Sequence, residues 1–162
     1  MAAIETPIIT MDAPETGYES VLQIADTRAR IISMSECEAD HVALRHMVDE
    51  TKWQLTTADT YQEGALKLRF LGAILVFSDC TLPDGTWRDV LTLTTDVEEP
   101  PLLVVTSRLA DERLWSEVLN LGGYDVLQKP FARDEVENLL ASVWRHRTHH
   151  RVLRPRALPA AS

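Results

Sequence analysis

Five short apolar stretches, separated by longer segments of mixed polarity, recur along most of the chain. The stretch AILVF, at residues 73–77, has no polar side chain, which is typical of a central parallel strand covered on both faces. The other four are similarly short and rich in β-branched or apolar residues. The five predicted strands are residues 30–34, 53–57, 73–77, 102–105 and 124–127.

The segments that follow these strands carry apolar residues at helical spacing. Helices are expected around residues 42–48, 61–70, 86–93, 110–121 and 134–144. The pair Gly122-Gly123 is a stop signal for the fourth helix. Strands that alternate with helices favour a parallel sheet with helices on both faces, so the expected fold class is α/β, a doubly wound five-stranded sheet. The positions expected to face its core from the first two helices are Val42, Leu44, Met47, Val48, Ala65, Leu66 and Leu68.

Both ends of the chain differ from this alternating region, which spans residues 29–146. Residues 1–28 sustain no period and are expected to be a mostly flexible extension. Residues 145–156 hold five arginines and three histidines but no acid. Residues 147–162 are therefore expected to be a basic tail that engages either the domain's own acidic surface or an acidic partner. The last helix is expected to continue past Trp144 for about one or two turns and then to fray, because Pro155 and Pro159 forbid a longer helix.

Composition narrows the class of function. A chain of 162 residues can bury one core, and a net charge of −9 argues against a general nucleic-acid binder, which needs clustered basic residues. The two cysteines, Cys37 and Cys80, are too few for a disulfide framework, and Cys80 is expected to be a small buried residue rather than a redox switch. There is no leader pattern and no apolar run of about 18 residues, so no membrane span is expected and the expected location is the cytoplasm.

Polar side chains end several of the predicted strands. In an open parallel sheet, ligands bind beyond the carboxyl ends of the strands. A carboxylate, a hydroxyl and a lysine are therefore expected to converge on one edge of the sheet. The residues at the strand ends are Ser35 and Glu36, Asp79, Thr106 and Lys129.

These groups suit the transfer of a phosphoryl group to an aspartate. The carboxylate of Asp79 can attack phosphorus, and the transferring group then spreads negative charge over three oxygens that cations must neutralise. Lys129 supplies one fixed positive charge, and Thr106 supplies a hydroxyl donor. Mg²⁺, a hard cation that prefers carboxylate oxygens and water, would supply further positive charge.

Four segments, in order, resemble the receiver domain of two-component response regulators. They are residues 74–85 (ILVFSDCTLPDG), 102–106 (LLVVT), 121–127 (LGGYDVL) and 129–131 (KPF). The resemblance covers residues 29–146 and implies a flavodoxin-like sheet with the strand order 2-1-3-4-5. It makes Asp79 the phosphoacceptor, Thr106 the hydroxyl that turns toward the phosphoryl group, and Lys129 its cationic partner.

The resemblance also implies a metal site and a cis peptide bond before Pro130. Mg²⁺ would be held by Asp79, Glu36 and the backbone carbonyl of Thr81, although Glu36 fits equally well as an ordinary helix-start acid. Receivers usually carry two acidic residues after the first strand, whereas Ser35 stands at one of those positions here. The loss of one carboxylate should weaken magnesium binding, because affinity for a hard cation follows ligand charge.

A second departure lies in the fifth predicted strand. Val126 stands where many receivers have an aromatic residue that swings inward on activation. Tyr124 lies two residues earlier and is expected on the same face of the strand. The usual aromatic readout is therefore in doubt.

The favoured hypothesis is a stand-alone receiver that accepts a phosphoryl group on Asp79 from a histidine kinase or phosphotransfer protein. Its output would be contact with a downstream protein partner, or with a second copy in a homodimer, through the fourth and fifth helices and the fifth strand. Such a chain is no enzyme beyond self-catalysed phosphoryl transfer and dephosphorylation, and this domain binds no nucleic acid. One alternative is a phosphorylation-independent pseudo-receiver that acts as a docking module. The other, an aspartate-nucleophile hydrolase, usually has a second Asp where this chain has Thr81.

Overall fold

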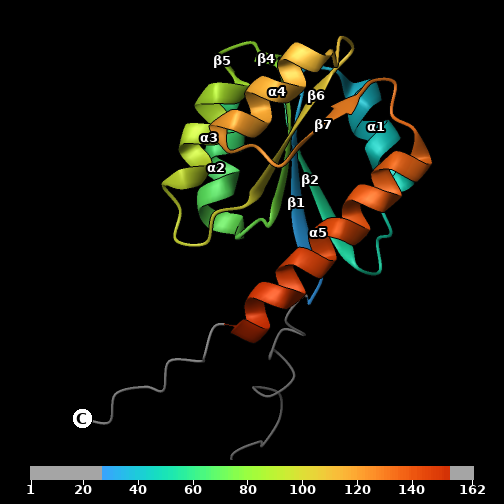
Figure 1. Cartoon of the computed structure of the whole chain (residues 1–162), viewed down its shortest axis with the longest axis vertical. Coiled ribbons are helices and arrows are strands. Elements are labelled where there is room, and N and C mark those ends of the chain that lie inside the picture. The colour runs from blue at the N-terminus through green and yellow to red at the C-terminus, as the bar shows by residue number, and fades with distance from the viewer. Residues whose placement is uncertain (1–26, 154–162) are drawn as a thin grey trace, which may run out of the picture.

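A computed structural model describes residues 27–153 of the chain, with side chains described to residue 149. Five parallel strands form one sheet in the order β2-β1-β3-β6-β7 (Figure 1). This is the predicted order 2-1-3-4-5, so the predicted doubly wound α/β class is confirmed. The strands are β1 (Ala29–Met34), β2 (Trp53–Ala58), β3 (Leu75–Asp79), β6 (Leu102–Ser107) and β7 (Asp125–Gln128).

Helices cover both faces of the sheet. Helices α1 and α5 pack on one face, and α2, α3 and α4 pack on the other (Figure 1). Gly122 ends α4 in the left-handed conformation, with φ of +105°, which confirms the predicted stop. The helices are α1 (Glu38–Met47), α2 (Tyr61–Leu71), α3 (Trp87–Thr95), α4 (Glu112–Leu121) and α5 (Arg133–Leu153).

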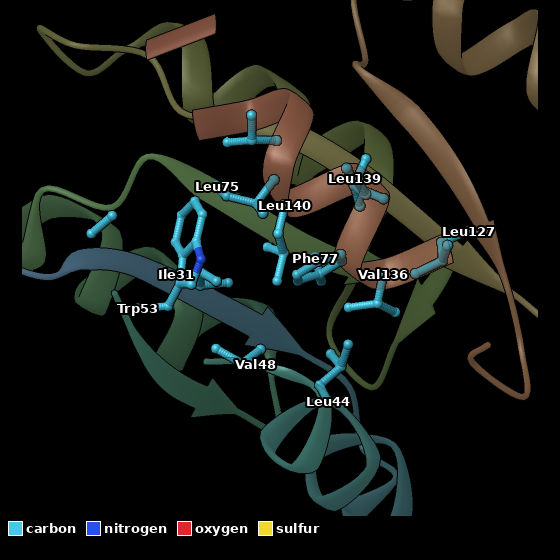
Figure 2. Close-up of a cluster of buried hydrophobic side chains, with 13 residues drawn as sticks. Ile31, Leu44, Val48, Trp53, Leu75, Phe77, Leu127, Val136, Leu139 and Leu140 are labelled. Carbon is cyan, nitrogen blue, oxygen red and sulfur yellow. The ribbon is translucent and has the colours of Figure 1, made fainter. Parts of the chain in front are cut away.

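Because successive side chains of a strand point to opposite faces, each face of the sheet has its own core. On the face of α1 and α5, Phe77 of the central strand packs among apolar side chains from both helices (Figure 2). On the other face, Val76 of the same strand belongs to a core that contains side chains of α2, α3 and α4. The residues of the first core labelled in Figure 2 are Ile31, Leu44, Val48, Trp53, Leu75, Phe77, Leu127, Val136, Leu139 and Leu140.

Two of the predicted core positions are wrong. Val42 is 36% exposed and Leu66 is 59% exposed. Both lie two residues from a buried leucine of the same helix, Leu44 in α1 and Leu68 in α2. Two residues correspond to a rotation of about 200° around a helix, so neighbours at this spacing face opposite ways.

The third strand lies two residues later than predicted, at Leu75–Asp79 instead of 73–77. Asp79 is therefore the last residue of the central strand, and it is in register with Thr106 of β6. The chain then makes a small antiparallel hairpin of β4 (Thr81–Leu82) and β5 (Gly85–Thr86), which the sequence pattern did not predict. The turn of this hairpin is Pro83-Asp84, and both residue types favour turns.

The last helix is longer than predicted. It begins at Arg133 and continues through the start of the basic segment to Leu153, which is about two and a half turns past Trp144. Residues 1–26 of the predicted extension and the end of the basic tail lie outside the described residues. Within residues 27–153, no helix is both long and apolar enough to span a membrane.

Candidate functional site

The carboxyl edge of the sheet brings three strand-end residues onto Asp79. Its Oδ1 accepts a hydrogen bond from Thr106 Oγ1 at 2.5 Å and lies 2.6 Å from Lys129 Nζ. Its Oδ2 accepts a hydrogen bond from Ser35 Oγ at 2.7 Å. The convergence of a carboxylate, a hydroxyl and a lysine is therefore present, and Ser35 adds a second hydroxyl.

The ammonium of Lys129 bridges two carboxylates. Besides Asp79, it contacts Asp40 Oδ2 at 2.6 Å, and the three side chains are only 7% (Lys129), 12% (Asp40) and 14% (Asp79) exposed. Burial alone lowers the pKa of Lys129, but the hydrogen bonds and charges of Asp40 and Asp79 outweigh burial and raise this pKa above its ordinary value. The lysine is therefore a fixed cation at neutral pH. The peptide bond between Lys129 and Pro130 is cis, as predicted.

Asp40 is a site residue to which the strand-end pattern did not point. It lies in the first turn of α1, where an acidic residue is favourable at any helix start. The sequence therefore gives no reason to separate it from an ordinary first-turn acid. Its burial and its contact with Lys129, 89 residues away in sequence, distinguish it only in the folded chain.

His41, the next residue of α1, forms a hydrogen bond that holds the loop containing Ser35 in place. Its ring is fully buried, and Nε2 lies 2.9 Å from the backbone carbonyl of Ser35. Because a carbonyl can only accept, Nε2 carries the hydrogen of this bond. Nδ1 lies 3.1 Å from Ser33 Oγ, whose hydroxyl can donate to it. Consecutive residues of α1 thus hold Lys129 on one side of Asp79 and Ser35 on the other.

The loop after Asp79 is fixed at its far end by Asp84. Its two carboxylate oxygens accept the backbone N–H groups of Tyr61 at 2.6 Å and Gln62 at 2.9 Å, in the first turn of α2. The hydrogen bond from Gln62 has the largest effect on the pKa of Asp84 and, together with that from Tyr61, keeps this pKa below its ordinary value although burial acts in the opposite direction. The acidic residue of the Leu-Pro-Asp-Gly segment therefore ties the loop after Asp79 to a neighbouring helix.

Cys80, directly after Asp79, is partly buried. Burial raises the pKa of its thiol, and the nearby Asp79 charge acts in the same direction, while a hydrogen bond with Ser107 opposes them. A neutral thiol is a poor nucleophile and a poor metal ligand at physiological pH. Cys80 packs against the core of α2, α3 and α4, but it is only partly buried instead of buried as expected.

The expected metal ligands supply oxygen donors of the right kind, but few charges. Glu36, on the loop after β1, and Thr81, the first residue of β4, are both exposed, so solvent ions can reach them. Glutamate, aspartate and a carbonyl are hard oxygen ligands of the type that Mg²⁺ prefers. Within the described part of the chain, however, no three acidic, histidine or cysteine side chains gather in a way that could hold a metal. The expected magnesium site therefore depends on two carboxylates and one carbonyl.

The expectation that Tyr124 and Val126 share a strand face is wrong. Tyr124 packs with the core of α1 and α5, whereas Val126 packs with the core of α2, α3 and α4. Tyr124 lies one residue before β7 begins, so strand alternation does not apply to it. Its hydroxyl is 2.7 Å from Ser142 Oγ of α5.

Comparison with known proteins identifies the fold. No family model and no curated protein matches the chain. Among solved structures, the signal receiver domain of a putative LuxO repressor protein from Vibrio parahaemolyticus is 16% identical, with a TM-score of 0.73 over 80% of this chain and 99% of that chain. The signal receiver domain of an HD domain-containing protein from Pseudomonas fluorescens Pf-5 is 19% identical, with a TM-score of 0.70 over 79% and 95% of the two chains.

A third similar structure is the beryllofluoride-activated NtrC4 receiver domain dimer, which is 18% identical, with a TM-score of 0.66 over 72% of this chain and 97% of that chain. Identities this low establish the fold alone. The chain therefore has the fold of response regulator receiver domains, as its resemblance predicts.

Proposed function

We propose that this chain is a response regulator receiver that accepts a phosphoryl group on Asp79 from a histidine kinase or phosphotransfer protein. The observation that carries the proposal is the set of donors around Asp79, in which Ser35, Thr106 and Lys129 all contact its carboxylate at the carboxyl edge of a receiver-type sheet. This role is that of a signalling phosphoacceptor in the cytoplasm, with at most self-catalysed transfer and dephosphorylation.

The proposed transfer uses the groups in place. A carboxylate oxygen of Asp79 attacks the phosphorus of the donor, the phosphorus–donor bond breaks, and the leaving group departs with that electron pair. The product is an acyl phosphate on Asp79. Lys129 neutralises part of the charge that spreads over the phosphoryl oxygens, and Thr106 donates its hydroxyl to one of them.

We also propose that magnesium assists this site weakly. Glu36, Asp79 and the carbonyl of Thr81 would be its protein ligands, and the bound ion would supply additional positive charge at the phosphoryl oxygens. Ser35 keeps the affinity for magnesium low, because its hydroxyl brings no negative charge to a position where receivers usually have a carboxylate.

Replacing Ser35 by aspartate is expected to make stability depend on magnesium. Ser35 is only 2% exposed, and its Oγ lies 2.7 Å from Asp79 Oδ2, so a carboxylate there would repel Asp79 unless a cation joined them. We expect Ser35→Asp to melt well below wild type in EDTA. Magnesium at a hundred times its Kd should restore about 2.7 kcal/mol of unfolding free energy.

The neutral variant Ser35→Asn is the matched control for this measurement. Thermal melts with and without magnesium should shift much less for wild type and for Ser35→Asn than for Ser35→Asp. Equal shifts in the two variants would mean that Ser35 does not occupy an acidic ligand position.

The proposed output is contact through the surface of α4, β7 and α5. A groove of about 750 Å³ lies there, lined by residues that include Trp115, Tyr124, Val126 and Asn138. Trp115 is 48% exposed, which suits it to a partner's surface. A downstream protein or a second copy would occupy this surface; one solved receiver of this fold is itself a dimer.

We propose the domain division 1–28, 29–146 and 147–162, although α5 crosses the second boundary without a break.

One alternative has an observation in its favour. Both oxygens of Asp79 are engaged by protein donors, and the described residues gather no group of three acidic side chains for a metal. A phosphorylation-independent pseudo-receiver that docks partners would need no more than this arrangement.

Chemical phosphorylation separates the two functions. Wild type incubated with acetyl phosphate and magnesium should gain the mass of one phosphoryl group, and hydroxylamine should remove it, because hydroxylamine cleaves acyl phosphates but not serine or threonine phosphoesters. No gain with any donor would favour the pseudo-receiver. A gain that resists hydroxylamine would place the group on a hydroxyl side chain.

A further inference from the structure

Asp40 supplies the site with a second carboxylate, and it does so from helix α1 rather than from the end of β1. Its Oδ2 lies 2.6 Å from Lys129 Nζ, the same distance as Asp79 Oδ1. An ammonium has three N–H donors, so these two contacts leave one donor for an incoming group. The residue at the end of β1, Ser35, offers only a hydroxyl.

A helix-start role alone does not explain where Asp40 lies. The same turn of α1 contains Glu38, which interacts favourably with the helix dipole and remains exposed. The side chain of Asp40 is only 12% exposed, and burying a carboxylate is unfavourable unless it is paired. Its pairing is with Lys129, and no other side-chain contact of the Asp40 carboxylate is needed to account for its burial.

Transfer of a phosphoryl group changes what Lys129 has to contact. Before transfer, the ammonium is shared between the carboxylates of Asp79 and Asp40. Once one oxygen of Asp79 is bonded to phosphorus, the negative charge moves outward onto the phosphoryl oxygens. A lysine held by Asp79 alone would have lost its only anchor at that moment. The Asp40 carboxylate does not change during the step.

We propose that Asp40 is a positioning residue that holds Lys129 in the site throughout phosphoryl transfer. Lys129 keeps its contact with Asp40 as a pivot and swings from Asp79 to a phosphoryl oxygen. Helix α1 thereby replaces the carboxylate that the end of β1 lacks. The inference rests on the proposed function of Asp79 as phosphoacceptor.

Two measurements on Asp40→Asn test the inference, one of them without phosphorylation. The chain has three lysines, Lys52, Lys67 and Lys129, and Lys52 is 65% exposed, so it serves as an internal standard for amine acetylation read by peptide mass. In wild type, Lys129 should react far more slowly than Lys52. In Asp40→Asn, its labelling should rise on the order of tenfold, the equivalent of one charge-assisted hydrogen bond.

Phosphoryl uptake from acetyl phosphate should fall on the order of tenfold in the same variant, since a misplaced cation costs rate. Glu38→Gln removes the exposed acid of the same helical turn and should change neither measurement. Asp40→Glu keeps the charge but moves it by one methylene, so both effects should appear in smaller size. This variant carries the test if Asp40→Asn does not fold.

The outcomes are distinct. Unchanged Lys129 labelling in Asp40→Asn, or wild-type uptake despite raised labelling, would overturn the positioning role. If Asp40→Glu has to carry the test, values equal to wild type in both measurements would overturn it as well. If wild type took up no phosphoryl group, the proposed function would be overturned, and this inference with it. In that case Lys129 would still be labelled more slowly than Lys52 in wild type, which distinguishes this outcome from failure of the positioning role alone.

Discussion

Replacing Asp79 by asparagine is expected to abolish phosphoryl uptake while the melting temperature changes by only a few degrees. An amide is nearly the same shape as a carboxylate but is not a nucleophile toward phosphorus. Its oxygen can still accept a hydrogen bond from Thr106 or Lys129, and Lys129 keeps Asp40 as its charged partner. The fold should therefore survive a change that removes the reacting group.

The other aspartate of the same loop provides a matched control for this variant. Asp84 is exposed and accepts two backbone hydrogen bonds from α2. Asp84→Asn should lose some thermal stability and still take up a phosphoryl group, as measured by intact mass after incubation with acetyl phosphate. Uptake retained by Asp79→Asn but lost by Asp84→Asn would assign the acceptor to Asp84.

Replacing Lys129 by methionine is expected to have a large effect on both rate and stability. Removing one group that stabilises transition-state charge typically slows an enzyme on the order of a hundredfold, and we expect phosphoryl uptake to slow by that factor. The change also leaves the carboxylates of Asp40 and Asp79 nearly buried without their shared cation. Breaking such a buried arrangement costs about 3 kcal/mol, or about 10 °C in melting temperature for a domain of this size.

Lys52→Met is the matched control, because Lys52 makes an exposed ion pair with Asp49 at 3.6 Å. Exposed pairs contribute at most about 1 kcal/mol, so this variant should melt close to wild type and take up phosphoryl groups at the wild-type rate. Equal effects of Lys52→Met and Lys129→Met on uptake would contradict the proposed role of Lys129.

The pH dependence of stability gives a second check on Lys129. Its pKa is raised above the ordinary 10.5 in the folded chain. A group of this kind contributes stability that is fully present below its unfolded pKa and is lost as the pH rises through its folded pKa. The stability difference between wild type and Lys129→Met should therefore persist from pH 7 to 9 and diminish only above about pH 10.5.

The fold and the strand-end residues of the candidate site could be predicted from the sequence, because both depend on local patterns. The apolar run around Val76 marks the central strand, and residues that end parallel strands meet at one edge whatever the loops between them do. Asp79, Thr106 and Lys129 could be placed together on that basis, and the structure places them in direct contact.

Asp40 and His41 could not be predicted, for a physical reason. Their roles depend on which side of α1 faces the sheet. The spacing of apolar residues predicts that Val42 faces inward, whereas Asp40 and His41 are buried and Val42 is exposed. Two polar side chains occupy inward positions because each has a partner at the sheet edge, Lys129 for Asp40 and the Ser35 carbonyl for His41. Such partners come from distant parts of the sequence, and hydrophobic patterning does not record them.

The position of the phosphoryl group on the chain is the most direct test of the whole account. Borohydride reduces an aspartyl phosphate to homoserine, so wild type treated with acetyl phosphate, reduced and digested should yield the peptide that contains residue 79 with homoserine in place of Asp79. The same treatment without acetyl phosphate should leave that peptide unchanged. Homoserine at Asp84 or Asp40, or the hydroxynorvaline that reduction of a phosphorylated Glu36 would give, with Asp79 intact, would contradict the assignment of Asp79 as the phosphoacceptor.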